Sequence, residues 1–279
     1  GRAISRLEED FGVALVRRMA QGHALTEQGQ TLASLAAPHV AALTDVASAL
    51  GRESEEAYGT LRITAPPDLG TLVLGPILPG FLARYPRLSI EIDHSLRLVD
   101  LVAEGFDFAI RVMTRPMPSS TLVARKLARL DLGLYASTTY LSRHDAPRKP
   151  ESLTQHDHIY FQRITQHSEL SLEGPNGKVK VPIAARMGAN DFFFVRQAIV
   201  SGAGIGALPW HVAQEDVAAG RLVRVLSDYR LAGTIAYLVH PPLRPLPPKL
   251  KVFRSFLLEH ASRFLVEPSL LKIDDSHRR

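Results

Sequence analysis

The sequence of 279 residues contains no cysteine. Disulfide bonds and metal sites with cysteine ligands are therefore excluded. The chain also lacks any uninterrupted apolar run of the roughly 20 residues that a membrane-spanning helix needs, because proline, glycine or a charged residue breaks each candidate. No secretory signal pattern is visible in these residues. We therefore expect a cytoplasmic protein with no membrane partner.

Acidic residues are scarce relative to basic ones: 28 Asp and Glu stand against 33 Lys and Arg, which gives a net charge of +5. This balance permits a polyanionic partner such as nucleic acid but does not require one. Hydrophobic residues make up 46% of the chain and charged residues 22%, as in ordinary globular proteins. The length suits a helical segment followed by two lobes of roughly 100 residues each.

The first 26 residues combine an amphipathic helix with a basic turn. Ile4, Leu7 and Phe11 recur at helical spacing, which predicts a helix that faces a small core and ends at Gly12. Arginines on the other flank of such a helix can read guanine edges in the major groove, and basic residues of the following turn can approach phosphates. The alternative is a solvent-exposed basic helix end with no nucleic-acid partner. The candidate DNA contacts are Arg2, Ser5, Arg6, Arg17, Arg18 and His23.

The order of apolar, glycine and threonine positions in this segment resembles the winged helix-turn-helix of LysR-type transcriptional regulators. Two positions depart from the family pattern: Val16 stands where an aromatic residue is preferred, and Gln21 where a basic one is frequent. Residue 1 would fall inside the family's recognition helix, so we expect a chain that is N-terminally truncated within its DNA-binding domain. The matching positions are Ile4, Leu7, Glu8, Phe11, Gly12, Leu15, Arg18, Leu25, Thr26 and Gly29.

A long helix is predicted from Thr26, which can cap it, to about residue 52. Its apolar seam recurs at alternating steps of four and three, as in a coiled coil, although an amphipathic helix that lies on its own domain is the alternative. Pro38 should kink this helix or remove a hydrogen bond, at a cost of about 3 kcal/mol if nothing compensates. In LysR-type regulators this element is the linker helix through which subunits pair, so we expect a homodimer or homotetramer. The seam comprises Leu32, Ala36, His39, Leu43, Val46 and Leu50, and Leu32, Leu43, Val46 and Leu50 are the candidate dimer contacts.

Beyond Tyr58 the pattern changes to short strands that alternate with helices, which predicts βαβ units around a largely parallel sheet. Strands are expected at 61–65, 88–93, 107–112, 122–127, 131–136, 159–162, 169–173, 178–182, 205–208, 222–225 and 234–239. Helices are expected at 69–85, 96–103, 191–201, 210–219 and 248–264.

Two consecutive α/β series of similar size indicate a hinged pair of lobes with a ligand between them. The resemblance agrees, because LysR-type regulators carry a two-lobed effector domain shaped like a periplasmic binding protein. The predicted fold class is therefore α/β: a partial winged helix-turn-helix (1–25), a linker helix (26–56) and this effector domain. Its first lobe would comprise 59–130 and 238–265 and its second 131–237, with crossings near 125–132 and 234–238 and a loose tail at 266–279.

Motifs that suggest catalysis or cofactor binding have simpler interpretations here. The glycine run 202–206 imitates a nucleotide-binding loop, but it follows a helix and precedes a strand, which is the reverse of the required order. His156 and His158 share a strand face but have no third ligand at metal-site spacing. Ser201 lacks the preceding glycine of a nucleophile elbow. We therefore expect no enzyme activity, no metal and no cofactor.

A ligand in such a fold is expected where helix N-termini follow strand ends. Two places have this order: Pro67-Asp68 and Asn190-Asp191. The alternative is that these polar residues are only helix caps. By the resemblance the two helix starts face one another across the cleft between the lobes, and Asp68 and Asp191 could repel a carboxylate, so the ligand's charge stays open. Further candidates at strand ends are Ser95, Arg111, Ser137 and Pro209.

These observations predict a sequence-specific DNA-binding transcriptional regulator that is controlled by a small-molecule effector. Two alternatives stay open. One is a stand-alone solute-binding protein of the periplasmic type, which would need a signal sequence and no basic helical prefix. The other is an enzyme on the same two-lobe scaffold, which would need a convergent catalytic set.

Overall fold

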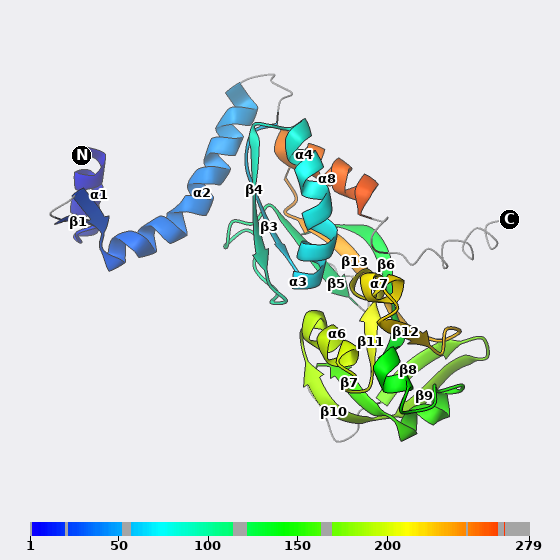
Figure 1. The fold of residues 1–279 in the computed structure, drawn as a ribbon. Helices are drawn as coiled ribbons and strands as arrows, with labels where there is room; N and C mark the ends of the chain where they lie inside the picture. The colour runs from blue at the N-terminus through cyan, green and yellow to red at the C-terminus, as the bar shows by residue number, and fades with distance from the viewer. Residues whose placement is uncertain are drawn as a thin grey trace.

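The computed structural model describes residues 2–19, 22–51, 57–113, 122–162, 169–243, 245–261 and 265. Figure 1 shows a small N-terminal unit, a long helix that leads away from it, and a main body at the other end of that helix. The expected domain limits at 52–56 and the tail at 266–279 lie outside the described residues. In the described part of the chain, no helix is both long enough and apolar enough to cross a bilayer.

The N-terminal unit consists of one helix and a two-stranded hairpin: α1 (Arg2–Phe11), β1 (Val16–Met19) and β2 (Gly22–Leu25). The turn from Leu25 to Gly29, which leads into the next helix, has a clear structural reason. The hydroxyl of Thr26 accepts the amide of Gly29 at 3.0 Å and donates to the carbonyl of Ala14 at 2.7 Å. A Cβ at Gly29 would collide with the carbonyl oxygen of Leu15, so only glycine fits.

The apolar face of α1 is exposed to solvent in this structure. We expected Ile4, Leu7 and Phe11 to face a small core, but their exposed fractions are 42%, 42% and 56%. Among the described residues, the only buried apolar side chain of this unit is Leu15. The predicted packing of α1 is therefore wrong for the part of the chain that the structure describes.

The helix α2 (Glu27–Gly51) continues past Pro38 without a break and bends along its course (Figure 1). Leu32 is half-buried, whereas Leu43 is 68% exposed. The side chains of Val46 and Leu50 lie outside the described part.

The main body is built on one mixed sheet of 11 strands, in the order β10-β7-β11-β6-β13-β5-β3-β4, with β12 beside β6 and the β8–β9 hairpin beside β13. Pairing is parallel among β3, β4 and β5 and among β7, β10 and β11, and antiparallel wherever β6 or β13 takes part. The strands are β3 (Gly59–Ala65), β4 (Leu88–His94), β5 (Phe108–Met113), β6 (Val123–Ser137), β7 (Asp157–Phe161), β8 (Glu169–Gly174), β9 (Gly177–Pro182), β10 (Ala184–Ala189), β11 (Ile205–Pro209), β12 (Leu222–Val225) and β13 (Arg230–His240).

The first helical segment of this body is broken into three pieces. It begins as α3 (Pro67–Leu69), continues as the π-helix η1 (Gly70–Leu74) and ends as α4 (Gly75–Arg84), which contains Pro79. The remaining helices are α5 (Thr138–Leu141), the 3₁₀ helix η2 (Pro150–Gln155), α6 (Phe192–Val200), α7 (Trp210–Ala218) and α8 (Pro248–His260).

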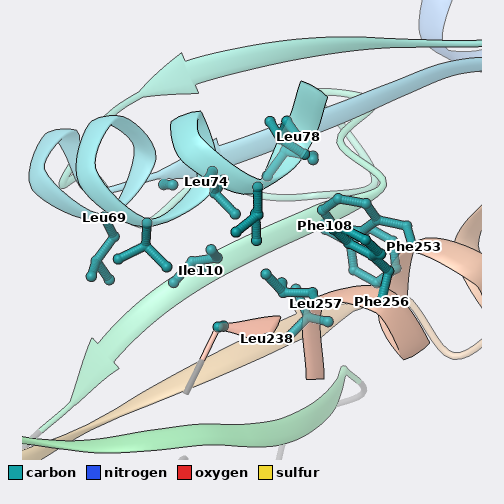
Figure 2. Close-up of a cluster of buried hydrophobic side chains, with 14 of the residues drawn as sticks. Leu69, Leu74, Leu78, Phe108, Ile110, Leu238, Phe253, Phe256 and Leu257 are labelled. Carbon is teal, nitrogen blue, oxygen red and sulfur yellow. The ribbon is translucent and has the colours of Figure 1, made fainter. Parts of the chain in front are cut away.

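Separate hydrophobic cores define two lobes. In the first lobe, α4 and α8 pack on β5 and β13, and Phe81 meets Phe253 edge to face at 5.4 Å; Figure 2 shows this cluster. The second lobe holds two further clusters around α6, α7 and the β8–β9 hairpin. Strand β6 belongs to both lobes, because Ala128 and Leu130 pack in the first core whereas Leu134 and Ala136 pack in the second.

The structure corrects three expectations about secondary structure. Residues 96–103 form no helix; a turn at 101–105 takes its place, where the carboxylate of Asp100 accepts the amides of Val102 and Ala103 and so satisfies them locally. The strands expected at 122–127 and 131–136 are one continuous strand, β6, because it carries the chain from one lobe to the other. Strand β10 and the short helices α5 and η2 were not predicted.

Candidate functional site between the lobes

A cavity of about 650 Å³ lies where the two lobes meet. Pro66, Pro67 and Asp68 line it from the first lobe, together with Leu96 and Val112. The second lobe contributes the start of α6, the end of β7 and the first residues of β8, Glu169 to Ser171, among other segments. Both helix starts that the sequence singled out therefore face the same cavity.

The first-lobe wall is shaped by the two prolines at the end of β3. Their fixed φ angles turn the chain out of the strand, and Pro67 occupies the first position of α3, where a missing N–H costs nothing. The carbonyl of Pro66 accepts the amide of Gly70 at 2.8 Å. A Cβ at Gly70 would collide with the imidazole of His94, so glycine lets the helix approach the neighbouring strand β4. This arrangement leaves the Asp68 side chain at the cavity, only 8% of the residue being exposed.

The second-lobe wall is built at the start of α6. Asp191 caps this helix, because its carboxylate accepts the amide of Phe193 at 2.8 Å. The ring of Phe192 stacks on Phe161 from β7, with centroids 3.9 Å apart and an interplanar angle of 10°. Gln162, which follows β7, has a positive φ of 108° and donates its amide to Ala189 on the neighbouring strand at 2.7 Å.

One buried polar contact bridges the lobes. His211 of α7 and Asp68 of α3 meet through Nε2 and Oδ2 at 2.8 Å, and the residues are 2% and 8% exposed. Leu72 of the first lobe also packs against the second-lobe core around α7. A buried carboxylate needs such a partner, so this pair couples the arrangement of the lobes to the geometry of the cavity.

His158 is the other buried histidine of the cavity lining. Its Nε2 lies 2.7 Å from the carbonyl of Leu153, which can only accept, so Nε2 carries the proton. Burial lowers the pKa of His158, although the bond to Leu153 opposes that shift. The neutral imidazole then presents Nδ1 as an acceptor, and this buried atom has no hydrogen-bond partner among the described residues.

The candidate ligand residues from the sequence divide into two groups. Pro67, Asp68, Asn190, Asp191 and Pro209 line the cavity. The other three, Ser95, Arg111 and Ser137, lie outside its lining.

Ser95 accepts the amide of Arg97 at 3.1 Å in the turn after β4. Arg111 is 8% exposed and donates to the carbonyl of Ile110 at 3.0 Å, and burial lowers the pKa of its guanidinium. Ser137 caps α5, because its hydroxyl accepts the amide of Tyr140 at 3.1 Å. The Nη2 atom of Arg111 is buried without a hydrogen-bond partner among the described residues. Because none of the three residues lines the cavity, we leave Ser95, Arg111 and Ser137 out of the candidate site.

Several lining residues carry no signal in the sequence. The cavity includes Leu130, Leu132 and Leu134, which look like ordinary core positions of a strand. Phe161 and His211 belong to a short strand and to a helix that no motif marks. Only the leucine at every second position from 130 to 134 could have indicated that this face of β6 lines a cavity between the lobes.

The motifs that were set aside have structural explanations. His156 bonds through Nδ1 to the hydroxyl of Tyr140 at 3.0 Å, and His158 is engaged as described above. No cluster of three potential metal ligands occurs within the part of the chain that the structure describes. Gly202 and Gly204 have φ of +82° and +150°, and a Cβ at Gly204 would collide with the carbonyl of Asp157. The glycine run thus ends α6 and lets β11 pair closely with β7. This agrees with its position in the sequence, after a helix and before a strand.

The candidate DNA-contact residues are only partly described. Ser5, Arg6 and Arg17 are exposed, on α1 and β1. The side chains of Arg2, Arg18 and His23, and the whole of Gln21, lie outside the described part. Glu8 ties α1 to the hairpin, because its carboxylate accepts the amides of Leu15 at 2.7 Å and Val16 at 3.0 Å.

Comparisons with known proteins agree with this architecture. The family model described as the LysR substrate binding domain matches residues 54–262. The uncharacterized HTH-type transcriptional regulator YhjC of Escherichia coli is 30% identical over 92% of this chain and 86% of its own length. The HTH-type transcriptional regulator PtxR of Pseudomonas aeruginosa is 28% identical over 93% of this chain and 83% of its own length.

The fold agrees as well. The full-length structure of the Vibrio cholerae virulence activator AphB, a member of the same family, superposes with a TM-score of 0.65 at 28% identity and covers 93% of this chain and 88% of AphB. The family match extends over most of the chain and includes the complete two-lobed body. This chain therefore belongs to the LysR-type transcriptional regulators, DNA-binding proteins with an effector-binding domain.

Proposed function

We propose that the cavity between the lobes is the effector site of this regulator. The observation that carries the proposal is the position of the cavity: both lobes line it, and the buried Asp68–His211 pair joins the lobes at its edge. A small molecule that contacts both walls favours one inter-lobe arrangement over others, because it binds that arrangement more tightly. Pro67, Asp68, Asn190, Asp191 and Pro209 are the proposed effector contacts from the original candidates.

We further propose that α2 pairs the subunits as a homodimer or homotetramer. Leu43 supports this, because a leucine that is 68% exposed in one chain is expected in a helix seam that a second chain covers. A change in the angle between the lobes would then alter how the paired N-terminal units lie on an operator. Because DNA is the proposed partner, we predict a cytoplasmic location.

The proposed DNA contacts are Arg2, Ser5, Arg6, Arg17, Arg18 and His23. Of these, Ser5, Arg6 and Arg17 are described and exposed; Ser5 and Arg6 lie on α1, and Arg17 lies on β1 of the hairpin that follows. A base contact by arginine contributes about 1–3 kcal/mol of discrimination, whereas a phosphate contact contributes to all sequences alike.

The test is a DNA titration by fluorescence anisotropy with the protein expressed from its own gene. The probe is a duplex selected from random sequence by repeated binding, and a scrambled duplex serves for comparison. Arg6→Ala should reduce the preference for the selected duplex. Arg17→Ala should weaken binding to both duplexes and reduce the slope of log affinity against log salt concentration by about one, the value for one lost phosphate contact. Arg148→Ala, an exposed arginine in the second lobe, is the matched control. Equal affinity of the unaltered protein for both duplexes would contradict sequence-specific regulation.

A further inference from the structure

We propose that the effector is an uncharged, mainly apolar molecule with a hydroxyl group, and that the cavity discriminates against carboxylates. This inference rests on the proposed function, because it assumes that the inter-lobe cavity is the effector site. It concerns the point that the sequence left open, the charge of the ligand.

Charged side chains in the cavity wall are of one sign. Asp68, Glu169 and Asp191 line it, and no lysine or arginine does so among the described lining residues. Asp68 already has His211 as a partner, and Glu169 already has Lys180 at 2.5 Å. A carboxylate ligand would approach lining carboxylates, of which Asp68 is buried, with no cation among the described lining residues to pair with, which is unfavourable.

The two helix starts do not compensate for this charge. Helix N-termini attract anions through free backbone N–H groups. At α6, the carboxylate of Asp191 itself occupies that position and accepts the amide of Phe193. At α3, Pro66 and Pro67 have no N–H to offer, and Asp68 follows them directly. Each helix start therefore already carries a carboxylate of the protein itself, Asp68 at α3 and Asp191 at α6, which opposes the binding of a second anion there.

The rest of the wall is apolar and suits a ring or a short chain. Leu130, Leu132 and Leu134 alternate along β6 and so present one face of the strand to the cavity. The stacked rings of Phe161 and Phe192 form another part of the wall. A volume of about 650 Å³ is within the range of pockets that hold drug-sized molecules.

The polar groups of the wall are mostly neutral and point to a hydroxyl. Gln162, Ser171, Asn190 and Thr234 line the cavity and can donate or accept. His158 belongs to the lining, and its Nδ1 atom is a buried acceptor without a described partner, so a ligand donor that reaches this atom would satisfy a buried group. A carboxylate, which only accepts, cannot make this bond.

The experiment compares three probes with the same apolar body: 4-phenylbutanol, 4-phenylbutyrate and 4-phenylbutylamine. Isothermal titration calorimetry with the protein expressed from its own gene should show the alcohol binding at least tenfold more tightly than the acid, and more tightly than the amine. Tighter binding of the acid or of the amine than of the alcohol would overturn the proposed ligand class. The absence of binding by all three probes at millimolar concentration would overturn it as well.

Two variants separate this inference from the proposed site. Ser171→Arg places a cation at an exposed position of the lining, so it should reverse the preference and favour the acid; Ser142→Arg, exposed but outside the lining, should not. An unchanged preference in Ser171→Arg would overturn the electrostatic argument.

Phe192→Ala should weaken whichever probe binds. If the acid binds best and Phe192→Ala weakens it, the cavity stays the site and only the ligand class is wrong. If Phe192→Ala leaves all binding unchanged, the proposed site itself is wrong.

Discussion

At the scale of single residues, buried histidines make the effector domain sensitive to acid. Burial lowers the pKa values of His156, His158 and His240 below the ordinary value of 6.5. The unfolded chain therefore binds these protons at a higher pH than the folded chain does. The contribution of these three histidines to the free energy of unfolding is then largest above pH 6.5 and decreases as the pH falls below it, because protonation favours the unfolded state.

His158→Gln is expected to reduce this pH dependence. The variant removes one proton that only the unfolded state binds in that range, so the melting temperature should fall less between pH 7 and pH 5 than in the unaltered protein. Differential scanning calorimetry across this range measures it, and His94→Gln, at an exposed position of β4, is the control. An equal decrease in both variants would show that His158 does not contribute.

Glu8 acts at the same scale in the N-terminal unit. The amides of Leu15 and Val16 hold the pKa of its carboxyl below its usual value. This bridge is present above the ordinary pKa of glutamate and is lost as the pH falls through the lowered pKa. In Glu8→Ala, hydrogen exchange at the amides of Leu15 and Val16 should accelerate, because both lose their acceptor. Glu9→Ala changes the same charge on the same helix without this contact; similar acceleration there would count against the bridge.

At the scale of elements, the glycine run between α6 and β11 fixes how closely two strands approach. Gly204→Ala is expected to lower the free energy of unfolding by about 1–3 kcal/mol, because φ of +150° is strained for alanine and its Cβ would meet the Asp157 carbonyl. Gly80→Ala is the control: it lies within α4 with open space around it, so it should stabilise by roughly 0.5–1 kcal/mol. Urea denaturation measures both, and a neutral Gly204→Ala would show that the strand pair can separate at little cost.

The helix α2 is the element that decides assembly. Leu43→Glu should shift the protein toward monomer at micromolar concentration, since a charge would be buried without a partner in the helix seam. Sedimentation velocity gives the result. Leu243→Glu introduces the same charge at an exposed leucine outside α2 and should leave the assembly unchanged. If the unaltered protein is monomeric under these conditions, the proposed pairing through α2 is wrong.

At the scale of the whole molecule, the Asp68–His211 contact is expected to stabilise one arrangement of the lobes. A double-mutant cycle with Asp68→Ala and His211→Ala should give a coupling energy of about 0.5–3 kcal/mol in thermal unfolding, as for buried polar pairs in direct contact. The exposed Lys180–Glu169 pair within the second lobe is the comparison, with an expected coupling below about 1 kcal/mol. A coupling near zero for Asp68 and His211 would mean that the two lobes are not held by this pair.

Local patterns were enough to predict much of this architecture. The alternation of strands and helices follows from apolar periodicity, and the start of α2 follows from Thr26 as a helix cap. The close contact that requires Gly29 is seen only in the structure. The same reasoning failed for residues 96–103, where the Asp100 side chain satisfies the backbone amides that a helix would otherwise bond. It also divided β6 in two, because nothing in its local sequence tells one long strand from two short ones.

By itself, the sequence determined the family, most of the strands and helices and two helix starts, because each depends on residues close together along the chain. Only the tertiary structure decided what surrounds those helix starts. Asp68 and His211 are 143 positions apart, and the leucines of β6 reach the cavity because that strand passes from one lobe into the other. Sequence spacing carries no information about such neighbours, since the fold of the intervening chain sets their distance. The composition of the cavity wall, and with it the charge of the ligand it favours, is therefore a property of the folded molecule alone.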